Sequence, residues 1–313
     1  MLNYILRRIL MMIPTAIGVF TIVFLLIHFI PGDPVLMMLG DDAPLVAIEN
    51  MRARLGLDQP LHVQYARFLT GIVQLDFGRS FANNRPVLDN ILQVFPHTLR
   101  LALAATMVSV AIGIPFGIVA SLNRDKFLDR TAMIGSLAGV SAPNFWLGLL
   151  LLTYFSVRLG WFPVTGAGAA GGVFGDVRYL VLPAVALGVA SAALLTRLTR
   201  SSMLEVIQQD YIRTARAKGL TERTIVYKHA LKNALIPVVT VVGINIGKLL
   251  GSTVTAEIVF SRPGIGALTV RSIYARDFPQ VQTNLMLYAV IFMAINLLVD
   301  ISYGFLDPRI KYD

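Results

Sequence analysis

Six apolar runs, each close to the length that crosses a lipid bilayer, limit what this chain can fold into. A helix needs about 20 apolar residues to cross roughly 30 Å of hydrocarbon. Backbone N–H and C=O groups must pair inside the bilayer, so runs of this kind form helices. We therefore predict an all-α polytopic membrane protein with about six transmembrane helices. The predicted spans are residues 9–30, 98–122, 131–157, 179–198, 234–254 and 285–305.

The composition agrees with a membrane protein. Charged residues make up 14% of the 313 residues, against about 25% in an average soluble domain. The net charge of +9 is also typical of nucleic-acid-binding proteins, but Lys and Arg in cytoplasmic loops explain it better, so we expect no nucleic-acid partner. The chain has no cysteine, which excludes disulfides, thiol catalysis and Cys-ligated zinc. The four histidines show no metal-ligand spacing, so we expect no metal site and no catalytic site.

The distribution of Lys and Arg predicts the orientation of the chain. With both termini in the cytoplasm, the inner segments hold fifteen basic and seven acidic residues, and the outer segments hold eleven and ten. Basic residues concentrate in cytoplasmic loops, so this orientation is preferred. The first span follows Arg7 and Arg8 and leads into Pro31-Gly32-Asp33-Pro34, not into a small-x-small cleavage site. We interpret it as a retained helix and not as a cleaved signal peptide.

Three segments are predicted to lie outside the membrane on the outer face. Residues 31–97 are polar and rich in turns, and they predict a helical insertion after the first span that is either a structural lid or a contact for an external partner. Within it, apolar residues at helical spacing indicate an amphipathic helix; they are Leu61, Tyr65, Phe68, Leu69 and Ile72. Residues 160–178 form a glycine-rich loop, and residues 260–280 are expected to be helical in their middle.

A basic loop, residues 199–233, connects the fourth and fifth predicted spans. We predict a helix over residues 201–218, with one face made of Leu204, Ile207, Tyr211 and Ala215. Gly219 is suited to a left-handed helix end, and Thr221 is suited to cap a second helix over residues 222–233. Small residues beside a charged rim indicate a docking surface. The alternative is a solvated loop held against anionic lipid headgroups.

The basic loop resembles the signature loop of permease subunits of bacterial ABC importers. That signature reads E-A-A-x-x-x-G, nine residues, then I-x-L-P. Ala215, Gly219 and Leu231 match it, whereas Arg213 replaces the Glu and Lys232 replaces the Pro. Five further stretches are similar to the peptide-importer branch of this family, in the order in which they occur. They are PGDP, LGLDQP, DYIRTARAKGL, FSRPGIG and NLLVDISYGFLDPRI, and they extend over residues 31–310.

The resemblance implies one of two membrane subunits around a central pathway in a bacterial inner membrane, surrounded by its lipids. The implied partners are a second homologous permease in a heterodimer, two cytoplasmic ATP-binding subunits that hold ATP and Mg²⁺, and a periplasmic or lipid-anchored substrate-binding protein. The chain itself is expected to bind no cofactor and to catalyse no reaction. The implied substrates are short peptides, with glutathione or nickel chelates as alternatives. The resemblance also implies ATPase docking by Glu205, Asp210, Tyr211, Arg213, Thr214, Ala215, Arg216, Lys218, Gly219 and Leu220.

The same resemblance implies a mechanism and a domain order. ATP binding is expected to draw the ATPase subunits together and to move the helix near residues 210–219 as a lever, so that the pathway opens outward; hydrolysis resets it inward. The expected domains are an N-terminal tail with the first span (1–30), a periplasmic helical subdomain (31–97), a five-helix permease core with its coupling loop (98–306) and a cytoplasmic tail (307–313).

The chain contains no phosphate-binding loop. Its closest stretch is Gly243 to Leu249, which is one residue short of the Walker A spacing and lacks the hydroxyl residue. We interpret Gly243, Gly247 and Gly251 as a small-residue packing face between membrane helices.

Polar residues within the spans are the candidates for the substrate pathway: Asn144, Trp146, Asn245, Lys248 and Asn296. Pro143 interrupts the third span, and it either exposes backbone carbonyls to the pathway or makes a packing kink. Lys248 lies in the middle of a span, where facing lipid costs about 2.5–3.5 kcal/mol or more, so we expect it to face the pathway or a carboxylate. Asp300 is expected in a structural pair, and Glu257 at a contact with the binding protein or the second permease.

Two other classes of protein compete with an ABC permease. An ion-coupled secondary carrier predicts internal repeats and carboxylates within the membrane. No repeat is evident, and Asp300 is the only carboxylate inside a predicted span. The other class is a membrane protein with a structural or enzymatic role and no transport activity; only the ABC permease requires bound ATPase subunits.

Overall fold

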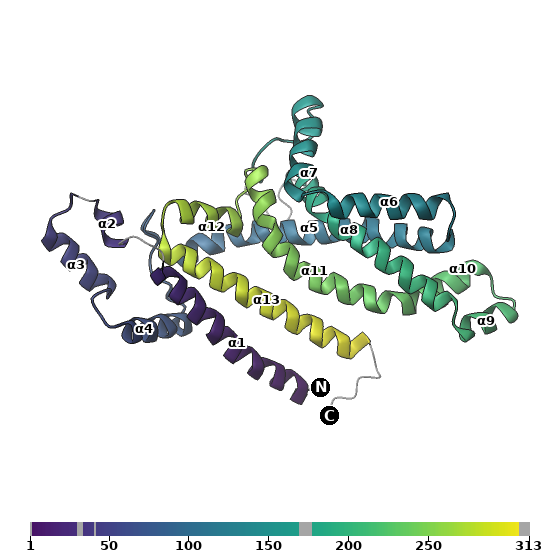
Figure 1. The fold of residues 1–313 in the computed structure, drawn as a ribbon, viewed down its shortest axis with the longest axis horizontal. Helices are drawn as coiled ribbons and strands as arrows, with labels where there is room; N and C mark the ends of the chain where they lie inside the picture. Colours follow the sequence, from purple (N-terminus) through teal and green to yellow (C-terminus); the bar gives the residue numbers. More distant parts are fainter. Residues whose placement is uncertain (1, 30–33, 41, 169–176, 307–313) are drawn as a thin grey trace. The chain divides into compact units, whose positions relative to one another are not determined.

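A computed structural model describes residues 2–29, 34–40, 42–168 and 177–306, and within these ranges the regular structure is helical. The first three residues of the PGDP motif, the loop residues 169–176 and the tail 307–313 lie outside the described residues. Figure 1 shows the helices. In chain order they are α1 (Leu2–Phe29), α2 (Pro34–Leu39), α3 (Leu45–Leu55), α4 (Leu61–Gln74), α5 (Val87–Leu122), α6 (Phe127–Ser141), α7 (Asn144–Leu151), the π-helix η1 (Leu152–Arg158), α8 (Arg178–Ile207), α9 (Asp210–Ala217), α10 (Glu222–Thr224), the π-helix η2 (Ile225–Ala230), α11 (Leu231–Val259), α12 (Ile265–Tyr274) and α13 (Phe278–Leu306).

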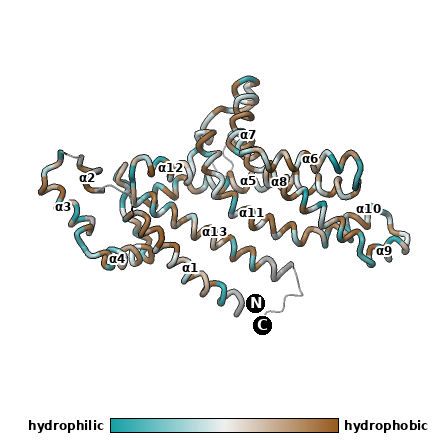
Figure 2. Tube along the Cα trace, in the orientation of Figure 1, coloured by the Kyte–Doolittle hydropathy of each residue, from teal (hydrophilic) through white to brown (hydrophobic). Residues whose placement is uncertain are grey.

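Five helices of the described chain are long and apolar enough to cross a membrane, which confirms five of the predicted spans. The hydropathy colouring in Figure 2 shows the many apolar residues along these helices. Most of these helices are longer than predicted. Thus α5 begins at Val87 and α8 continues to Ile207, because a helix does not end where the apolar part of its sequence ends. Together α10, η2 and α11 make one continuous helical stretch.

The third predicted span is interrupted at Pro143, as expected, and it is sharply bent there. Residues 127–158 form α6 and the α7–η1 helix, which meet at an angle of 101°. Pro143 explains the break, because a residue that precedes proline avoids the α region. Ala142 accordingly has an extended backbone with ψ 124°, and Pro143 begins the next helix with ψ 133°. The pair is either one bent span or a re-entrant segment.

The chain divides into two compact units. The first unit contains Met1–Ile5, His97–Pro263 and Ala294–Asp313, and the second contains Leu6–Pro96 and Gly264–Met293. In the first unit, α5, α8 and α11 share a hydrophobic core. This core is built from the buried residues Leu101, Ala105, Leu182, Ala184, Ala186, Leu187, Leu249, Ala256 and Phe260.

Small residues let α5 and α8 approach closely inside the first unit. A Cβ atom on Gly113 would lie 2.6 Å from the Cβ of Leu195, and one on Gly117 would lie 2.5 Å from the Cβ of Thr199. The predicted small-residue face on α11 is present only in part. A Cβ on Gly243 would lie 2.6 Å from Val299, but at Gly251 it would meet nothing within 4 Å. The sequence therefore contains a second small-xxx-small pair, on α5, that makes the closer packing.

The second unit is held together by an apolar cluster and by a buried carboxylate. Phe20, Val23 and Met286 form the buried centre of the cluster, and apolar residues of the predicted amphipathic helix, now α4, pack against it. The Asp277 carboxylate accepts hydrogen bonds from the Ser80 hydroxyl at 2.5 Å and from the Phe81 amide at 3.0 Å. The middle of the segment 260–280 is helical as predicted.

Candidate functional site

The basic loop leaves α8 through a sharp break. The helix α8 ends at Ile207, Gln209 is extended with ψ 149°, and α9 begins at Asp210. The prediction of one helix over residues 201–218 is therefore wrong. An acidic residue in the first turn favours a new helix start, because it faces the unpaired amides there. Asp210 occupies that turn, and the break sets α9 off from the long axis of α8 (Figure 1).

A hydrophobic cluster, which we call the loop core, lies under α9. Its buried members are Ile118, Met203, Ile212, Ala215, Ile225, Val226, Ala230 and Ala234, and Leu231 packs against them. These residues come from α5, α8, α9, η2 and α11, so the loop core joins α9 to three long helices. Burying an aliphatic side chain stabilises a fold by about 1.5–3 kcal/mol. Ile212, Met203 and Ile225 are fully buried, so we infer that α9 and its three supporting helices form one well-packed body.

The break also changes which residues face inward. Tyr211, predicted on the apolar face, is 43% exposed, and the inward positions are Ile212 and Ala215. Tyr211 was assigned to the apolar face because the helical spacing was continued from α8 into α9, although the helix is broken at Gln208 and Gln209. Ala215, one of the predicted docking residues, belongs to the loop core. The other predicted docking residues on α9 and after it are exposed: Asp210, Tyr211, Arg213, Thr214, Arg216, Lys218, Gly219 and Leu220; Glu205, on α8, is also exposed.

The predicted left-handed helix end and the predicted cap are both present. Gly219 has φ +77°, which side chains rarely adopt, and its amide donates to the Arg216 carbonyl at 2.9 Å. The Thr221 hydroxyl accepts from the Thr224 amide at 3.4 Å. A Cβ on Gly219 would meet nothing within 4 Å. The glycine is therefore required by backbone conformation and not by crowding within this chain.

Two side-chain contacts close the tip of the basic loop. Arg216 Nε donates to Glu222 Oε1 at 2.7 Å, and this bond raises the pKa of the Arg216 guanidinium despite partial desolvation. Asn233 Nδ2 donates to the Tyr211 hydroxyl at 2.7 Å. Both contacts join α9 to the helical stretch that follows it. Exposed ion pairs contribute about 0–1 kcal/mol, so the loop core carries most of the stability and these contacts fix the geometry of the tip.

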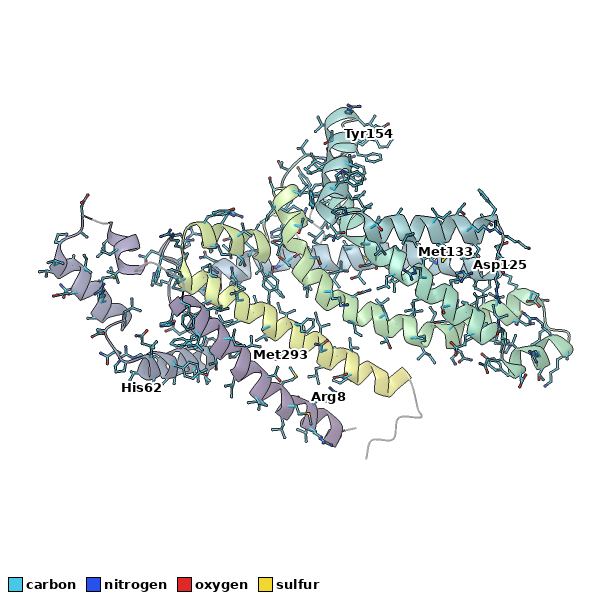
Figure 3. All side chains as sticks on the ribbon, in the orientation of Figure 1. Arg8, His62, Asp125, Met133, Tyr154 and Met293 are labelled. Carbon is cyan, nitrogen blue, oxygen red and sulfur yellow. The ribbon has the colours of Figure 1, made fainter. Side chains whose placement is uncertain are left out.

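A largely buried ion pair joins α8 to the first turn of α6. Arg200 donates to both oxygens of Asp129, through Nε at 2.5 Å and through Nη2 at 2.6 Å. The Asp125 amide donates to the same carboxylate at 2.9 Å, and Figure 3 labels Asp125 at the turn before α6. The Asp129 side chain is 4% exposed and the Arg200 side chain 23%. Sequence patterns gave no signal for this pair, because its partners lie 71 residues apart.

The predicted pathway residues come from three helices of the first unit. Asn144 and Trp146 begin α7 directly after the bend, and Trp146 is 50% exposed. Asn296 is half-buried on α13. Asn245 and Lys248 lie three residues apart on α11, so they are neighbours on one helix surface. Asn144 and Trp146 also share a helix, but residues two apart do not face each other, so only Asn245 and Lys248 are neighbours on one surface.

Glu257 is not at a contact surface in this chain. Its side chain is buried, and its Oε1 accepts a hydrogen bond from the Thr98 hydroxyl at 2.7 Å. Arg262 lies nearby in the first unit, where its Nη1 donates to the Tyr179 carbonyl at 2.7 Å. Burial lowers the pKa of the Arg262 guanidinium, while the charge of Glu257 acts in the opposite direction. The expected contact of Glu257 with a partner is therefore replaced by a buried polar cluster at the end of α11.

Among residues 2–29, 34–40, 42–168 and 177–306, no group of three or more His, Asp or Glu side chains is placed to hold a metal ion. The basic loop offers exposed donors and a small tip with a packed underside. This arrangement is suited to contact with another protein.

Comparison with known proteins identifies close relatives. Residues 113–312 match the family model of the binding-protein-dependent transport system inner membrane component, and residues 1–102 match the N-terminal model of the same kind of membrane component. The chain is 44% identical over its full length, and over the full length of the relative, to a glutathione transport system permease protein of Salmonella paratyphi A. It is 43% identical, again over both full lengths, to the corresponding protein of Escherichia coli K12.

Solved structures share the fold. An inward-facing structure of the MetNI methionine ABC transporter aligns with a TM-score of 0.58 at 22% identity, covering 69% of this chain and 95% of the other. A crystal structure of an amino acid ABC transporter with histidines aligns with a TM-score of 0.55 at 15% identity, covering 69% and 94%.

Proposed function

The chain belongs to the binding-protein-dependent transport system inner membrane components and is a permease subunit of an ABC importer, and we propose that its basic loop is where a cytoplasmic ATP-binding subunit docks. Membership in this family rules out the two competing hypotheses, an ion-coupled secondary carrier and a membrane protein without transport activity. The observation that carries the proposal is the two-sided construction of α9. Its inner side packs in the loop core, and its outer side is exposed and basic.

The exposed side of the basic loop has the composition of a protein interface. Tyr211, Leu220 and Tyr227 are 43%, 40% and 57% exposed, and basic side chains surround them. Aromatic residues and arginine are enriched at interfaces. Two of the departures from the family signature, Arg213 and Lys232, are exposed basic residues. In this proposal they face acidic groups of the ATPase subunit, whereas the matching Ala215 supports the loop from below.

The loop core explains how docking could move the membrane part. If α9 is displaced, the buried contacts of Ile212 require α8 and the η2–α11 helix to move with it. Packed interiors resist deformation, so the displacement passes on as a rigid-body motion. The Arg200–Asp129 pair extends this body to α6. ATP would thereby bias the permease between inward-open and outward-open states, through contacts that differ between the two states.

The remaining parts of the proposed machine follow from the family. They are a second permease, two ATPase subunits with ATP and Mg²⁺, and a substrate-binding protein outside the inner membrane; the basic loop and both termini lie in the cytoplasm. Residues 31–97 form a periplasmic subdomain, residues 98–306 the permease core, and membrane lipids surround the spans. The substrate class is short peptides. Glutathione is the first to test, since it is named in the full-length relatives described above.

Co-purification tests the docking proposal. The permease is expressed with its companion permease and the ATPase subunits, and the wild type is compared with the double variant Arg213→Glu, Lys218→Glu. Both side chains are exposed, so the variant should keep its fold. We expect the ATPase subunits to be lost from it. The control is Arg158→Glu, also an exposed arginine, at the end of η1. Equal ATPase recovery from all three chains would refute docking at this loop.

A further inference from the structure

One stretch of α11 differs in its exposed surface from the first span, α1. Between Val239 and Ile258, the exposed residues are Lys248 and Gly251. The helix α1, by contrast, exposes large apolar side chains along most of its length, among them Leu10 at 63% and Ile22 at 59%. An apolar surface suits lipid, and a lysine in the middle of a span does not. The exposed stretch of α11 therefore faces water or protein and not hydrocarbon.

Two neighbouring side chains of α11, the exposed Lys248 and the buried Asn245, carry hydrogen-bond donors that have no acceptor among the described residues. Lys248 forms no ion pair with any residue that the structure describes, although its ammonium group carries three donors. Asn245 is 7% exposed, and its Nδ2 finds no partner within the described ranges. Residues three positions apart on a helix are surface neighbours, with Cβ atoms about 5–6 Å apart. We call this pair the donor patch.

The chemistry of the donor patch specifies what it would bind. Buried polar groups are almost always hydrogen-bonded, so an unpaired buried amide indicates a missing partner. The partner must accept several hydrogen bonds and must be negative, because Lys248 contributes a full positive charge. A carboxylate meets both conditions, and its bonds to charged donors are about twice as strong as neutral ones. Gly251, one turn further along α11, leaves open space beside the patch, since a Cβ there would meet nothing within 4 Å.

We propose that the donor patch binds a carboxylate of the substrate as it passes along α11, and that the permease therefore favours short peptides with more carboxylates than amino groups. This inference rests on the proposed function. Glutathione belongs to the favoured class, because it has two carboxylates and one amino group. The other possible source of a carboxylate is the companion permease, and the experiment separates the two sources.

The test uses the complete transporter in liposomes, with the binding protein and ATP. Two pairs of substrates differ by one carboxylate: glutathione and its glycine amide, and Ala-Glu and Ala-Gln. Each peptide is supplied at a concentration that saturates the binding protein, as checked by calorimetry, so that initial uptake rates report the membrane step. The variants are Lys248→Met, which removes the charge, and Lys248→Arg, which keeps it. The control is Gly135→Ala on α6, where an added Cβ would meet nothing within 4 Å.

Lys248→Met should lower uptake of the more acidic peptide by about tenfold or more, as for a lost charge-assisted bond. Uptake of its neutral counterpart should fall by less, because the single carboxylate that it keeps is balanced by its own amino group. Lys248→Arg and Gly135→Ala should keep the wild-type ratio of the two uptake rates. Equal effects on both members of a pair would overturn the inference alone. Loss of the companion permease on purification of Lys248→Met would also overturn it, because the carboxylate would then be the companion's. If the wild type carries none of the four peptides, the proposed function fails, and the inference fails with it.

Discussion

Replacing Gly219 separates backbone strain from contact with a partner. The residue has φ +77°, and a Cβ there would meet nothing within 4 Å of this chain. An alanine in the left-handed region costs about 1–2 kcal/mol, whereas asparagine adopts this region more readily. Strain alone therefore predicts that Gly219→Ala is the more damaging change. Contact with an ATPase subunit predicts the opposite order, because the asparagine side chain is larger and would occupy the space where the partner lies.

The magnitude makes the two explanations distinguishable. A strain of about 1–2 kcal/mol weakens ATPase binding by about 5- to 30-fold at most, since 1.4 kcal/mol corresponds to a factor of ten. We expect Gly219→Asn to weaken ATPase binding by more than this factor. The thermal midpoint of Gly219→Asn in detergent should nevertheless be equal to or higher than that of Gly219→Ala. Binding is measured by titrating ATPase subunits onto the purified permease dimer, together with stimulated ATPase activity.

Gly160→Asn is the matched control for this measurement. Gly160 has φ +65°, equally open surroundings and a position outside the basic loop. The control should bind ATPase subunits as the wild type does. Wild-type binding by Gly219→Asn, or weaker binding by Gly219→Ala than by Gly219→Asn, would refute the reasoning that this glycine lies at the docking contact.

Two further predictions concern the packing that supports the basic loop. Asp129→Ala should lower the free energy of unfolding by about 3–5 kcal/mol, because it leaves the Arg200 guanidinium in a largely buried site without its carboxylate. Denaturation in detergent measures this loss. The double variant Asp129→Ala, Arg200→Leu should recover much of it, and a double variant as unstable as the single one would contradict the ion-pair explanation. Gly117→Ala should cost about 1–3 kcal/mol by crowding Thr199, from which the new methyl group would lie 2.5 Å. Gly135→Ala, where a Cβ meets nothing within 4 Å, is the control on α6 and should be neutral or stabilising; equal losses in both glycine variants would rule out crowding.

The lengths of the apolar runs predicted the transmembrane helices well, because a long apolar run in a bilayer has few other solutions. Sequence patterns failed where the chain bends. Pro143 was recognised as an interruption, but the angle of 101° between α6 and the α7–η1 helix was not predicted. The break before α9 carried no proline or glycine at all. Gln208 and Gln209 give no signal of a helix end, and the face assigned to Tyr211 was wrong for that reason.

Interactions between distant residues lay beyond the sequence. The Asp129–Arg200 pair joins positions 71 residues apart, and a single sequence contains nothing that relates them. The loop core was found only in part, through Ala215, since Ile118 comes from another helix. Local chemistry was more informative. The left-handed glycine at 219 and the threonine cap at 221 were both predicted, because each depends on the backbone within a few residues.

The two-sided construction of α9 also bears on how such transporters could diversify. The positions that match the family signature, Ala215 and Leu231, are buried or half-buried, and the matching Gly219 holds a backbone turn. Of the positions that depart from it, Arg213, Thr214 and Lys232 are exposed, and His229 is half-buried. Mutations on the exposed side change little packing, so pairing with a new ATPase could be selected without loss of membrane insertion. A duplicated permease gene could thus come to encode a subunit that pairs with a different ATPase and keeps the same substrate pathway.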